Sequence, residues 1–598
     1  MYSSFRRDVS INLGLYSDSL GEVPQKRQSL LRSWRRLSSL QRLVLLLVLV
    51  LCLLTAIFVL PKFFFAEDAS PITPGLKEPL QDSLPAVPKL NQIEGIDEKQ
   101  RNLDELKKQA QNDQDEKEEG IIPDIPQIDV PSKGQYDFFN GQVRNERQEQ
   151  VVEAFRHAWK AYKKYAWGHD ELHPLSKTST EWFGTGLTLV DSLDTMIIMG
   201  LKEEYEEARD WVRDKLSFKK DKFVNLFEIT IRVLGSLLST YHLSGDEIMK
   251  EKATELGQRL LPAFNSRSKI PYSDVNLAQG HARAPRWGPD SSTAEVATLQ
   301  LEFRDLSAVS GDKRFEEAVD QVSMHIHSLN KGDGLVPIFI NANTGTFRPS
   351  GTITLGARGD SYYEYLLKQW IQSNKKLDHF KRDFEDSYRG IKSKLFRRSE
   401  PNKLLFIGEL LGGRNFSPKM DHLVCFYAGT LALAHHYDLG EGDEYLDSAK
   451  ELAETCWQMY NRMATRLSPE ITYFNLAKGA TEDLIIKPLD AHNLLRPETV
   501  ESLFYLYRFT GDEKYRDQGW QIFLAFEKHT KVKGGGYSSI SNVRDAGNPR
   551  FKDKMESFFL SETLKYFYLL FSDDPRLINL DEWVLNTEGH PFPILKES

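Results

Sequence analysis

Apolar residues recur with helical spacing through most of the chain. In the segment 228–243, Ile231, Leu234, Leu238 and Tyr241 follow one another at intervals of three or four residues, which places them on one face of an α-helix. Aromatic and apolar periodicity becomes dense at about residue 145 and stays dense to the end. Strand-like patterns are short and scattered, such as the segment 351–355. The pattern predicts an all-α domain over residues 145–598, with a few short β-hairpins between its helices.

A phrase that recurs along this domain consists of a helical apolar run, the dipeptide Gly-Asp and a second amphipathic run. Its copies are Gly245-Asp246, Gly311-Asp312, Gly442-Asp443 and Gly511-Asp512. The intervals between the glycines are 66, 131 and 69 residues, so the middle interval is about two periods. A fixed period with glycine at each turn is typical of repeated helix–turn–helix units. Closing such hairpins into a ring would give this long segment a single core.

A glutamate lies near the start of several helices that lead into these turns. Glu228 precedes Gly245 by 17 residues, Glu295 precedes Gly311 by 16, and Glu498 precedes Gly511 by 13. The offsets differ by about one helical turn, so in a ring of helices the acids would gather at one end. Clustered carboxylates in such a place indicate acid–base chemistry, a hard metal ion, or both.

The N-terminal part of the chain has a different composition. Residues 43–60 form an uncharged run of 18 residues that follows several arginines, and this length just spans a bilayer. The arginine excess predicts that residues 1–42 form a short, disordered cytosolic tail. A cleaved signal peptide is the rival interpretation, which the long leader and the lack of a small-residue cleavage site disfavour. We expect a single-pass type II signal anchor.

Residues 61–144 lie between the anchor and the helical domain, and most of this segment, residues 66–140, is rich in Pro, Gln, Asp, Glu and Lys and contains few aromatic residues. Such a segment cannot bury enough apolar surface to fold alone. We therefore expect a largely disordered lumenal stem.

Charge and cysteine content exclude some classes of protein. The formal net charge of −9 over 598 residues argues against nucleic acid as the main partner. Three cysteines are too few for a disulfide scaffold. Cys52 lies in the apolar run, which leaves Cys425 and Cys456, 31 residues apart. These two could pair if the domain is lumenal, and the alternative is two buried free thiols.

Two glutamates stand in contexts that suit proton transfer. Glu228 and Arg232 are four residues apart on one helix face, where a cavity would raise the pKa of the acid and the arginine would orient it. Alone, such a pair is more typical of a surface ion pair. Pro497 is expected at the first position of a helix, so Glu498 would lie in its first turn as an ionised carboxylate suited to a general base. The alternative is dipole complementation alone.

A third candidate acid is Asp360. Ser361 and Glu364 have the spacing of a capping box. With Ser361 as the N-cap, Asp360 just outside the helix would be free for other work. The alternative is that Asp360 is itself the cap.

Two segments near the C-terminus suit sugar and metal binding. Phe558 and Glu562 share a helix face, where a sugar would find an aromatic platform beside a carboxylate, although a core Phe next to a surface Glu has the same spacing. Thr587 offers a carbonyl and a hydroxyl oxygen, both hard ligands for calcium, unless this segment is a frayed terminus. The chain contains no glycine-rich phosphate loop in a strand–helix context, no zinc-spaced Cys/His set and no Gly-x-Ser-x-Gly elbow.

In this order and spacing, these motifs closely resemble glycoside hydrolase family 47, the class I α-1,2-mannosidases. The phrases that carry the resemblance are Trp167-Gly-His-Asp-Glu-Leu, Asp191-Ser-Leu-Asp-Thr195, Asn225-Leu-Phe-Glu228, Lys269-Ile-Pro-Tyr-Ser273, Asp360-Ser-Tyr-Tyr-Glu-Tyr, Asp421-His422-Leu-Val-Cys425, Leu495-Arg-Pro-Glu-Thr-Val-Glu501, Lys554-Met-Glu-Ser-Phe-Phe and Asn586-Thr-Glu588. They run through essentially the whole domain from about residue 145. The resemblance implies an (α/α)7 barrel with its site at one end, and an inverting hydrolase that needs Ca2+.

The resemblance also implies roles for single residues. Glu228 and Asp360 match the acid-side carboxylates, with Glu228 acting through a water as the favoured proton donor, and Glu498 matches the base. Acid and base should stand roughly 6.5–9.5 Å apart in an inverting enzyme. The matched calcium site has Thr587 as its direct ligand and Glu295, Glu498, Glu562 and Glu588 around its waters. The matched sugar contacts are Arg232, Arg358, His422, Arg496, Phe558 and Glu562, and Cys425 and Cys456 match the disulfide.

The function implied is removal of α-1,2-linked mannose from high-mannose N-glycans in glycoprotein maturation and quality control. The implied place is the endoplasmic reticulum membrane, with the catalytic domain in the lumen and the Golgi as alternative. Arg358 matches an arginine of reticulum-type members where Golgi members have leucine, which predicts preferential removal of one middle-branch mannose. Two alternatives stay open: a lectin-like quality-control receptor with weak hydrolysis, and a Golgi-type mannosidase of broader branch specificity. Intact Glu228, Asp360 and Glu498 favour an active enzyme over a lectin.

Overall fold

The computed structural model describes residues 136–140, 142–285 and 288–595. The expected cytosolic tail and signal anchor, and nearly all of the expected stem, lie outside these residues. Within the described ranges, no helix combines the length and the apolar character needed to cross a membrane. The helices and strands below all belong to one unit of the chain, residues 124–598.

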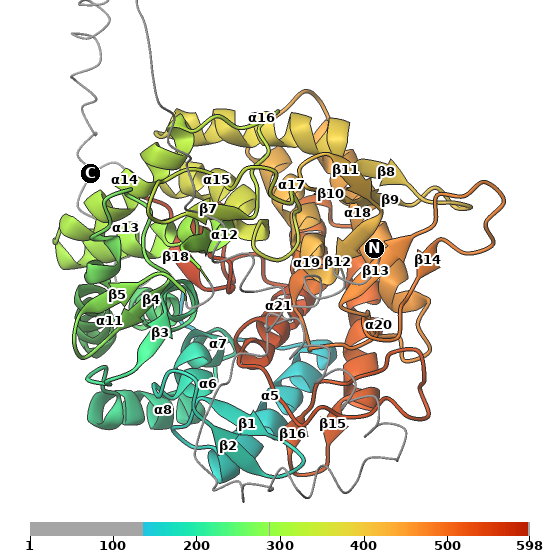
Figure 1. The fold of residues 1–598 in the computed structure, drawn as a ribbon. Helices are drawn as coiled ribbons and strands as arrows, with labels where there is room; N and C mark the ends of the chain where they lie inside the picture. The colour runs from blue at the N-terminus through green and yellow to red at the C-terminus, as the bar shows by residue number, and fades with distance from the viewer. Residues whose placement is uncertain (1–135, 141, 286–287, 596–598) are drawn as a thin grey trace, which may run out of the picture. The chain divides into compact units, whose positions relative to one another are not determined.

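Helices dominate the described residues and associate in antiparallel pairs, each of an inner and an outer helix. The pairs are α7 Leu193–Ile198 with α8 Lys202–Lys215, α10 Gly235–Ser244 with α11 Glu247–Leu260, α13 Gln300–Ser310 with α14 Arg314–Ser328, α15 Asp360–Gln372 with α16 Asp378–Lys394, α17 Phe426–His436 with α18 Glu444–Asn461, α19 Glu498–Thr510 with α20 Lys514–His529, and α21 Leu564–Phe571 with α5 Glu146–Tyr165. The prediction of a mainly helical domain is confirmed (Figure 1).

The inner helices also contact one another in chain order. Each of α7, α10, α13, α15, α17 and α19 contacts the next inner helix, and α19 contacts α21. The π-helical turn η4 (Phe559–Thr563), which leads into α21, contacts α7. The succession of contacts therefore returns to its starting helix.

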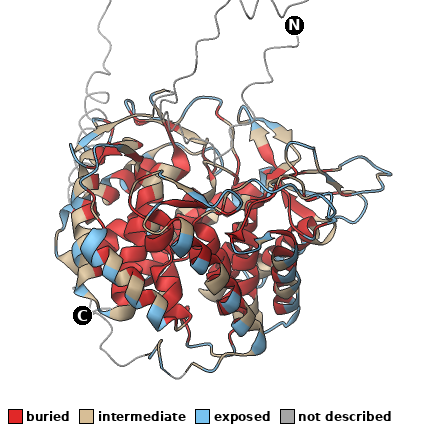
Figure 2. Cartoon of the chain, turned by 90° about the horizontal axis from the view of Figure 1, so that it is seen from below, coloured by how far each residue is buried: buried red, intermediate tan, exposed pale blue. Residues whose placement is uncertain are grey.

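Sequence periodicity separates the inner helices from the outer ones. Outer helix α16 buries Phe380, Phe384, Tyr388 and Ile391, which recur every three or four residues, and it exposes charged residues on its other face. Nearly every residue of inner helices α15 and α21 is buried. Figure 2 shows the same contrast, with buried residues filling the interior and exposed residues on the outer helices.

The Gly-Asp phrase makes the expected turn in three of its four copies. Gly245, Gly311 and Gly511 end α10, α13 and α19 in the left-handed conformation, with φ of 68°, 75° and 67°. The following aspartate accepts a hydrogen bond from a backbone N–H of the next helix, as in Asp246 to Ile248 at 3.1 Å. The fourth copy differs, because α17 ends at His436 and Gly442 lies in the longer connection before α18.

Short antiparallel hairpins and three-stranded sheets connect the helices, as expected. The strands are β1 Glu171–His173, β2 Thr178–Thr180, β3 Phe223–Asn225, β4 Asp274–Asn276, β5 His281–Arg283, β6 Asp290–Ser292, β7 Phe339–Asn341, β8 Phe396–Arg398, β9 Leu405–Ile407, β10 Glu409–Leu411, β11 Asn415–Ser417, β12 Lys419–Asp421, β13 Ile471–Phe474, β14 Leu484–Ile485, β15 Lys531–Val532, β16 Gly536–Tyr537, β17 Trp583–Leu585 and β18 Pro591–Pro593. The prediction of a strand at 351–355 is wrong, because this segment makes only one isolated bridge, from Ile353 to Leu410.

The last hairpin inserts its tip among the inner helices. The tip, residues 586–590, joins β17 to β18 and is buried at Asn586, Glu588 and His590. The Asn586 amide donates to the Ile231 carbonyl at 3.0 Å and to Glu302 of α13 at 2.8 Å. The C-terminal segment is therefore part of the interior, and the alternative of a frayed terminus at Thr587 is wrong.

Candidate active site

Acidic side chains lie in the first turn of five helical segments of the inner layer. These are Glu228 in α9 (Leu226–Ile229), Glu295 in α12 (Thr293–Val296), Asp360 in α15, Glu498 in α19 and Glu562 in η4. Because each outer helix returns the chain, successive inner helices begin at the same end. The charge of Glu498 acts on both Asp360 and Glu562, and that of Glu228 acts on Glu295, so the acids are neighbours.

Glu228 and Arg232 form the predicted pair, but inside the protein rather than on its surface. Arg232 Nε donates to Oε2 of Glu228 at 2.9 Å, and its Nη2 lies 2.7 Å from Oε1 of Glu588 at the hairpin tip. The side chains of Arg232 and Glu228 are only 11% and 15% exposed. Asn225 caps α9 by accepting a hydrogen bond from the Glu228 N–H at 2.9 Å. One guanidinium thus links a helix start to the inserted hairpin.

Two π-helical turns carry residues of this site. The predicted helix at 228–243 is present, but it is interrupted by the π turn η1 (Thr230–Leu234), which carries Arg232. The other π turn, η4, carries Glu562 and follows Phe558 directly. A π turn inserts one residue and rotates the side chains that follow. Both insertions lie where the acids converge.

Asp360 is the first residue of α15 and is partly buried. Burial raises the pKa of Asp360 to about 8, and the charges of Glu364, Asp421 and Glu498 add to this. The expected capping box is wrong: Gly359 occupies the N-cap position. The Ser361 hydroxyl accepts a hydrogen bond from Thr298 at 2.8 Å, because tertiary packing draws it away from the helix end. With this raised pKa, the Asp360 carboxyl group holds a proton at neutral pH.

Glu498 has the opposite electrostatic setting. It is the first residue of α19. Pro497 is the N-cap residue, so the helix begins one residue later than expected. His422 Nδ1 lies 2.7 Å from Oε2 of Glu498, and Arg496 Nη1 lies 3.6 Å from Oε1. Burial opposes the charge, but the hydrogen bond from His422 and the positive charge of Arg496 outweigh it and hold the pKa of Glu498 below its ordinary value. Two acids whose pKa values are shifted in opposite directions thus lie at neighbouring helix starts.

Phe558 provides an aromatic surface between two guanidinium groups. Arg232 and Arg496 lie 5.6 and 5.7 Å from its ring centre, within range of a cation–π contact. Arg496 Nε also donates to Glu470 at 2.7 Å. The structure thus brings together three of the side chains expected to contact a sugar, around a ring that is 8% exposed.

Arg358 lies two residues before Asp360 in the left-handed conformation, with φ of 74°. This is uncommon for a residue other than glycine and marks a position fixed by its surroundings. The Arg358 carbonyl accepts a hydrogen bond from the Ala294 N–H at 2.9 Å. Its guanidinium lies 3.6 Å from Glu295 and 5.5 Å from the centre of the Phe339 ring. Arg358 therefore connects the segment before α15 to α12 and its Glu295.

The hairpin tip carries the expected metal ligand. The Thr587 hydroxyl donates to Oε2 of Glu364 at 2.8 Å. Glu588, which follows Thr587, and Glu562 are both buried and act on each other. Burial and the Glu588 charge raise the pKa of Glu562 well above its ordinary value. Burial also raises the pKa of Glu588 to about 7. Oε2 of Glu588 is buried and has no hydrogen-bond partner among the described residues.

These groups fit a hydrated cation better than a directly caged one. Within the described ranges, no set of three or more His, Cys, Asp and Glu side chains is placed to ligate a metal ion directly. A hard cation on the oxygen atoms of Thr587, with its waters held by Glu562 and Glu588, would relieve the repulsion between these carboxylates. Glu498 belongs to the same cluster through its charge on Glu562.

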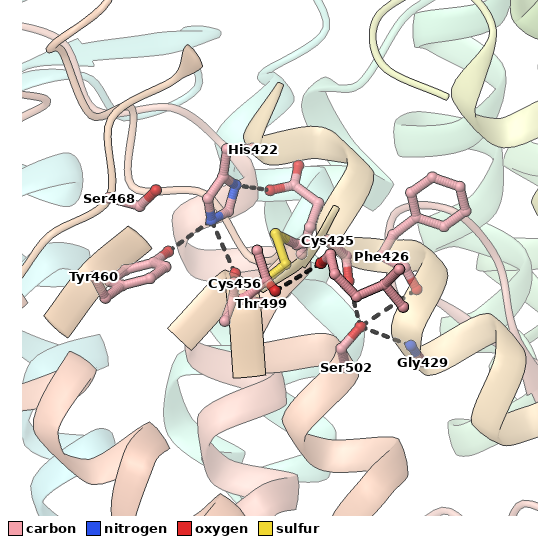
Figure 3. Close-up of a disulfide and its surroundings, with 12 residues drawn as sticks. His422, Cys425, Phe426, Gly429, Cys456, Tyr460, Ser468, Thr499 and Ser502 are labelled. Carbon is pink, nitrogen blue, oxygen red and sulfur yellow. Dashed lines mark hydrogen bonds and ion pairs between the residues drawn. A yellow bond between two sulfur atoms is a disulfide. The ribbon is translucent and has the colours of Figure 1, made fainter. Parts of the chain in front are cut away.

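Cys425 and Cys456 form a disulfide, as expected, with Cα atoms 5.9 Å apart. Cys425 ends the short helix η3 (His422–Cys425) before α17, and Cys456 lies in α18. Figure 3 shows the bond beside His422, Tyr460 and Thr499. The cross-link thus joins the two chain segments that place His422 and Tyr460.

A charged network beneath the site was not predicted. His590 lies 2.7 Å from Asp194 and 3.2 Å from Asp191, and Lys565 Nζ donates to Asp194 at 2.9 Å. Burial opposes protonation of His590, but the two aspartates outweigh it and raise its pKa. The network anchors the hairpin tip. Two aspartates three residues apart in an apolar stretch of sequence were the available signal, since charged groups in a core require partners.

Comparison with known proteins places these features in a family. Residues 154–594 match the family described as glycosyl hydrolase family 47. The chain is 60% identical over 452 residues to the mouse protein named endoplasmic reticulum mannosyl-oligosaccharide 1,2-alpha-mannosidase, covering 75% of this chain and 68% of that protein. It is 59% identical to the human protein of the same name, covering 75% and 64%. A human mannosyl-oligosaccharide 1,2-alpha-mannosidase IB is 41% identical, with 75% and 70% covered.

A solved structure, the alpha-1,2-mannosidase from Trichoderma reesei, superposes with a TM-score of 0.70 at 28% identity. The match covers 76% of this chain and all of that structure. The family match extends over nearly all of the described residues, and it includes the acids at the helix starts and the hairpin tip. The chain therefore belongs to glycosyl hydrolase family 47 and is a glycosidase.

Proposed function

We propose that the chain hydrolyses terminal α-1,2-linked mannose of high-mannose N-glycans with inversion, and that it acts in glycoprotein maturation and quality control. The names of its most similar relatives support the substrate class. The observation that carries the proposal is the contrast between the surroundings of two acids: His422 and Arg496 contact Glu498 and lower its pKa, whereas burial and nearby carboxylates raise the pKa of Asp360 to about 8. Environments that push two carboxyl pKa values apart mark an acid and a base.

The roles follow from these settings. Glu498 takes a proton from a water, while His422 and Arg496 hold its carboxylate. Asp360 supplies the proton that the departing sugar oxygen requires, because it is the acid that burial keeps protonated. This assignment differs from the sequence expectation, which favoured Glu228 as donor. Oε2 of Glu228 already accepts a hydrogen bond from Arg232, so we assign Glu228 to orienting groups around the leaving sugar.

We propose Ca2+ as the cofactor, held by Thr587 directly and by Glu295, Glu498, Glu562 and Glu588 through water. A bound calcium ion would supply positive charge to the hydroxyl groups of the terminal mannose. Oε2 of Glu588, which lacks a partner among the described residues, supports this placement. Glu295 lies beside Arg358 and within the influence of the Glu228 charge, and it would hold a water of the ion.

Thr587→Ala is expected to weaken calcium binding by about 10–100-fold, as loss of an oriented ligand does in metal sites. Excess chelator should abolish activity and lower the melting temperature of the wild type, because a ligand that binds only the folded state stabilises it. Isothermal titration and thermal unfolding measure both effects. Thr510→Ala, at the far end of α19, serves as control and should bind calcium normally. Full activity in excess chelator would refute a role for calcium.

Branch choice should depend on residues outside the acid cluster, and Arg358 is the best placed. Its guanidinium offers several fixed donors to sugar hydroxyls. We expect the wild type to remove one middle-branch mannose and give a single eight-mannose isomer. Arg358→Leu should slow this cleavage and relax the preference, as judged by chromatographic separation of the isomers. Arg348→Leu is the matched control, since Arg348 also lies over the Phe339 ring, at 5.9 Å. An unchanged isomer pattern in the Arg358 variant would place specificity elsewhere.

We also propose that the paired helices close into an (α/α)7 barrel. The return of the inner-helix contacts from η4 to α7 supports closure. For the N-terminal part, we retain a cytosolic tail at 1–42, a signal anchor at 43–60 and a stem at 61–144, on the composition of these segments. The relatives named as endoplasmic reticulum enzymes support a lumenal domain in that compartment.

The proposal is tested by incubating a nine-mannose glycan with the protein, with and without Ca2+, and identifying the product. Release of one mannose that depends on calcium is expected. Binding without release would favour the lectin-like alternative, and rapid removal of several mannoses would favour a mannosidase of broader specificity. The higher identity to the reticulum-named relatives, 59–60% against 41% for mannosidase IB, supports the narrower specificity.

A further inference from the structure

The general base of the proposed function is held by a chain of buried polar groups that begins outside the inner helices. His422 is 1% exposed, and both of its ring nitrogens face protein groups. Nδ1 lies 2.7 Å from Oε2 of Glu498, and Nε2 lies 2.8 Å from the Tyr460 hydroxyl and 3.1 Å from the Thr499 hydroxyl. Figure 3 shows these contacts converging on the imidazole. Both ring nitrogens of His422 are therefore already engaged by protein groups.

The chemistry of the partners gives each hydrogen bond a direction. A carboxylate only accepts hydrogen bonds, so Nδ1 of His422 must donate to Glu498. In the tautomer that carries its proton on Nδ1 alone, Nε2 is an acceptor and a hydroxyl donates to it. Tyr460 is completely buried, and burial together with the Glu498 charge raises its pKa well above the ordinary value, so the phenol keeps its proton.

The backbone around this chain of groups is cross-linked. Tyr460 lies one helical turn after Cys456 in α18, and His422 lies three residues before Cys425. The disulfide therefore joins the segments on which the phenol and the imidazole are carried. The backbone N–H of His422 also donates to the Glu470 carbonyl at 2.8 Å, which fixes the backbone of this segment.

We propose that Tyr460 is a positioning residue for the base: its phenol donates to Nε2 of His422, fixes the imidazole proton on Nδ1, and thereby holds one oxygen of Glu498. The other oxygen, Oε1, is then presented toward Arg496 and the site. Tyr460 does not contact the substrate in this account. It acts through His422, and its effect should appear in turnover rather than in substrate binding.

Tyr460→Phe removes the donor and keeps the ring. We expect kcat to fall about tenfold, the cost of one well-placed hydrogen bond, while KM stays within about twofold. Tyr427→Phe is the matched control, because the Tyr427 hydroxyl is equally buried but has no hydrogen-bond partner among the described residues. It should leave kcat unchanged, and equal melting temperatures of the two variants would exclude a folding defect.

Nitrogen-15 NMR of histidine-labelled protein tests the tautomer without any substitution at Tyr460. The wild-type His422 signals, assigned by their loss in His422→Gln, should show a neutral ring with its proton on Nδ1. A ring protonated on Nε2, or on both nitrogens, would overturn the proposal even if Tyr460→Phe did not fold.

This inference rests on the assignment of Glu498 as base, and the two can fail separately. If Glu498→Gln retains turnover, the assignment itself is wrong. If Glu498→Gln is inactive while Tyr460→Phe has wild-type kcat, the base stands and the positioning role of Tyr460 is overturned.

Discussion

Glu498→Gln is expected to bind a nine-mannose glycan almost as tightly as the wild type and to lose turnover by at least about 10³-fold. The amide keeps the shape of the carboxylate and can still accept the hydrogen bond from His422 Nδ1 at 2.7 Å. It cannot take a proton from water, and general base catalysis contributes about 10²–10⁴ in rate. Steady-state kcat and glycan affinity, measured on the same preparation, separate the two effects.

Glu513→Gln is the control for the amide substitution. Glu513 precedes α20, is exposed and lies 3.5 Å from Arg516, away from the acid cluster. Its variant should retain wild-type kcat. Turnover of the Glu498 variant within about tenfold of the wild type would refute the assignment, because no other group in the account can activate the water.

Asp360→Asn is expected to lower kcat by about 10²–10⁴-fold, because an amide cannot transfer a proton to the departing sugar oxygen. The deficit should shrink with α-mannosyl fluoride, whose leaving group requires no proton. Glu498→Gln should not be rescued in this way. Equal rescue of both variants, or rescue of Glu228→Gln alone, would move the proton donor away from Asp360.

The pH dependence of the wild type follows from the same group. Burial raises the pKa of Asp360 to about 8, so the acid is protonated below this pH and loses its proton above it. The value of kcat/KM reports the free enzyme and should therefore decline as the pH rises through about 8. At low pH the opposite limb belongs to Glu498, which must be ionised to act and has a lowered pKa. A profile that is flat through this alkaline range would contradict the role of Asp360.

Local rules were enough to predict the helix ends and the acids in them. A glycine that follows an apolar run, such as Gly245, Gly311 or Gly511, ends its helix in the left-handed conformation whatever surrounds it. An acid in a first turn is likewise favoured by the helix dipole. The same rule failed at Gly442, where the preceding helix ends earlier, because a repeat predicts a turn but not the length of the connection.

Features that depend on distant contacts could not be read from the pattern. The π turns at 230–234 and 559–563 insert a residue without changing the spacing of apolar residues enough to reveal it. The placement of the hairpin tip depends on a hydrogen bond from Asn586 to Ile231, 355 residues away in the chain. Ser361 does not cap its helix as expected, because its hydroxyl is hydrogen-bonded to Thr298 rather than to the helix end.

The site residues likewise divide into those that local sequence predicts and those that depend on distant contacts. Glu228, Asp360 and Glu498 could be proposed from the sequence, since each acid lies near the start of a predicted helix. The groups that set their protonation, such as His422 and Arg496 on Glu498, come from other segments and meet only in the folded chain. The resemblance matched His422 and Arg496 to sugar-contacting positions, whereas in the structure both contact Glu498, and Tyr460 and Thr499 contact His422.

The central claim is that Glu498 activates a water that attacks the terminal mannose from the face opposite the departing sugar. The anomeric form of the first mannose released tests this most directly. Proton NMR spectra, recorded during digestion of the nine-mannose glycan and before the free sugar mutarotates, should show β-mannose appearing ahead of α-mannose. Release of α-mannose first would mean retention of configuration and would contradict the account.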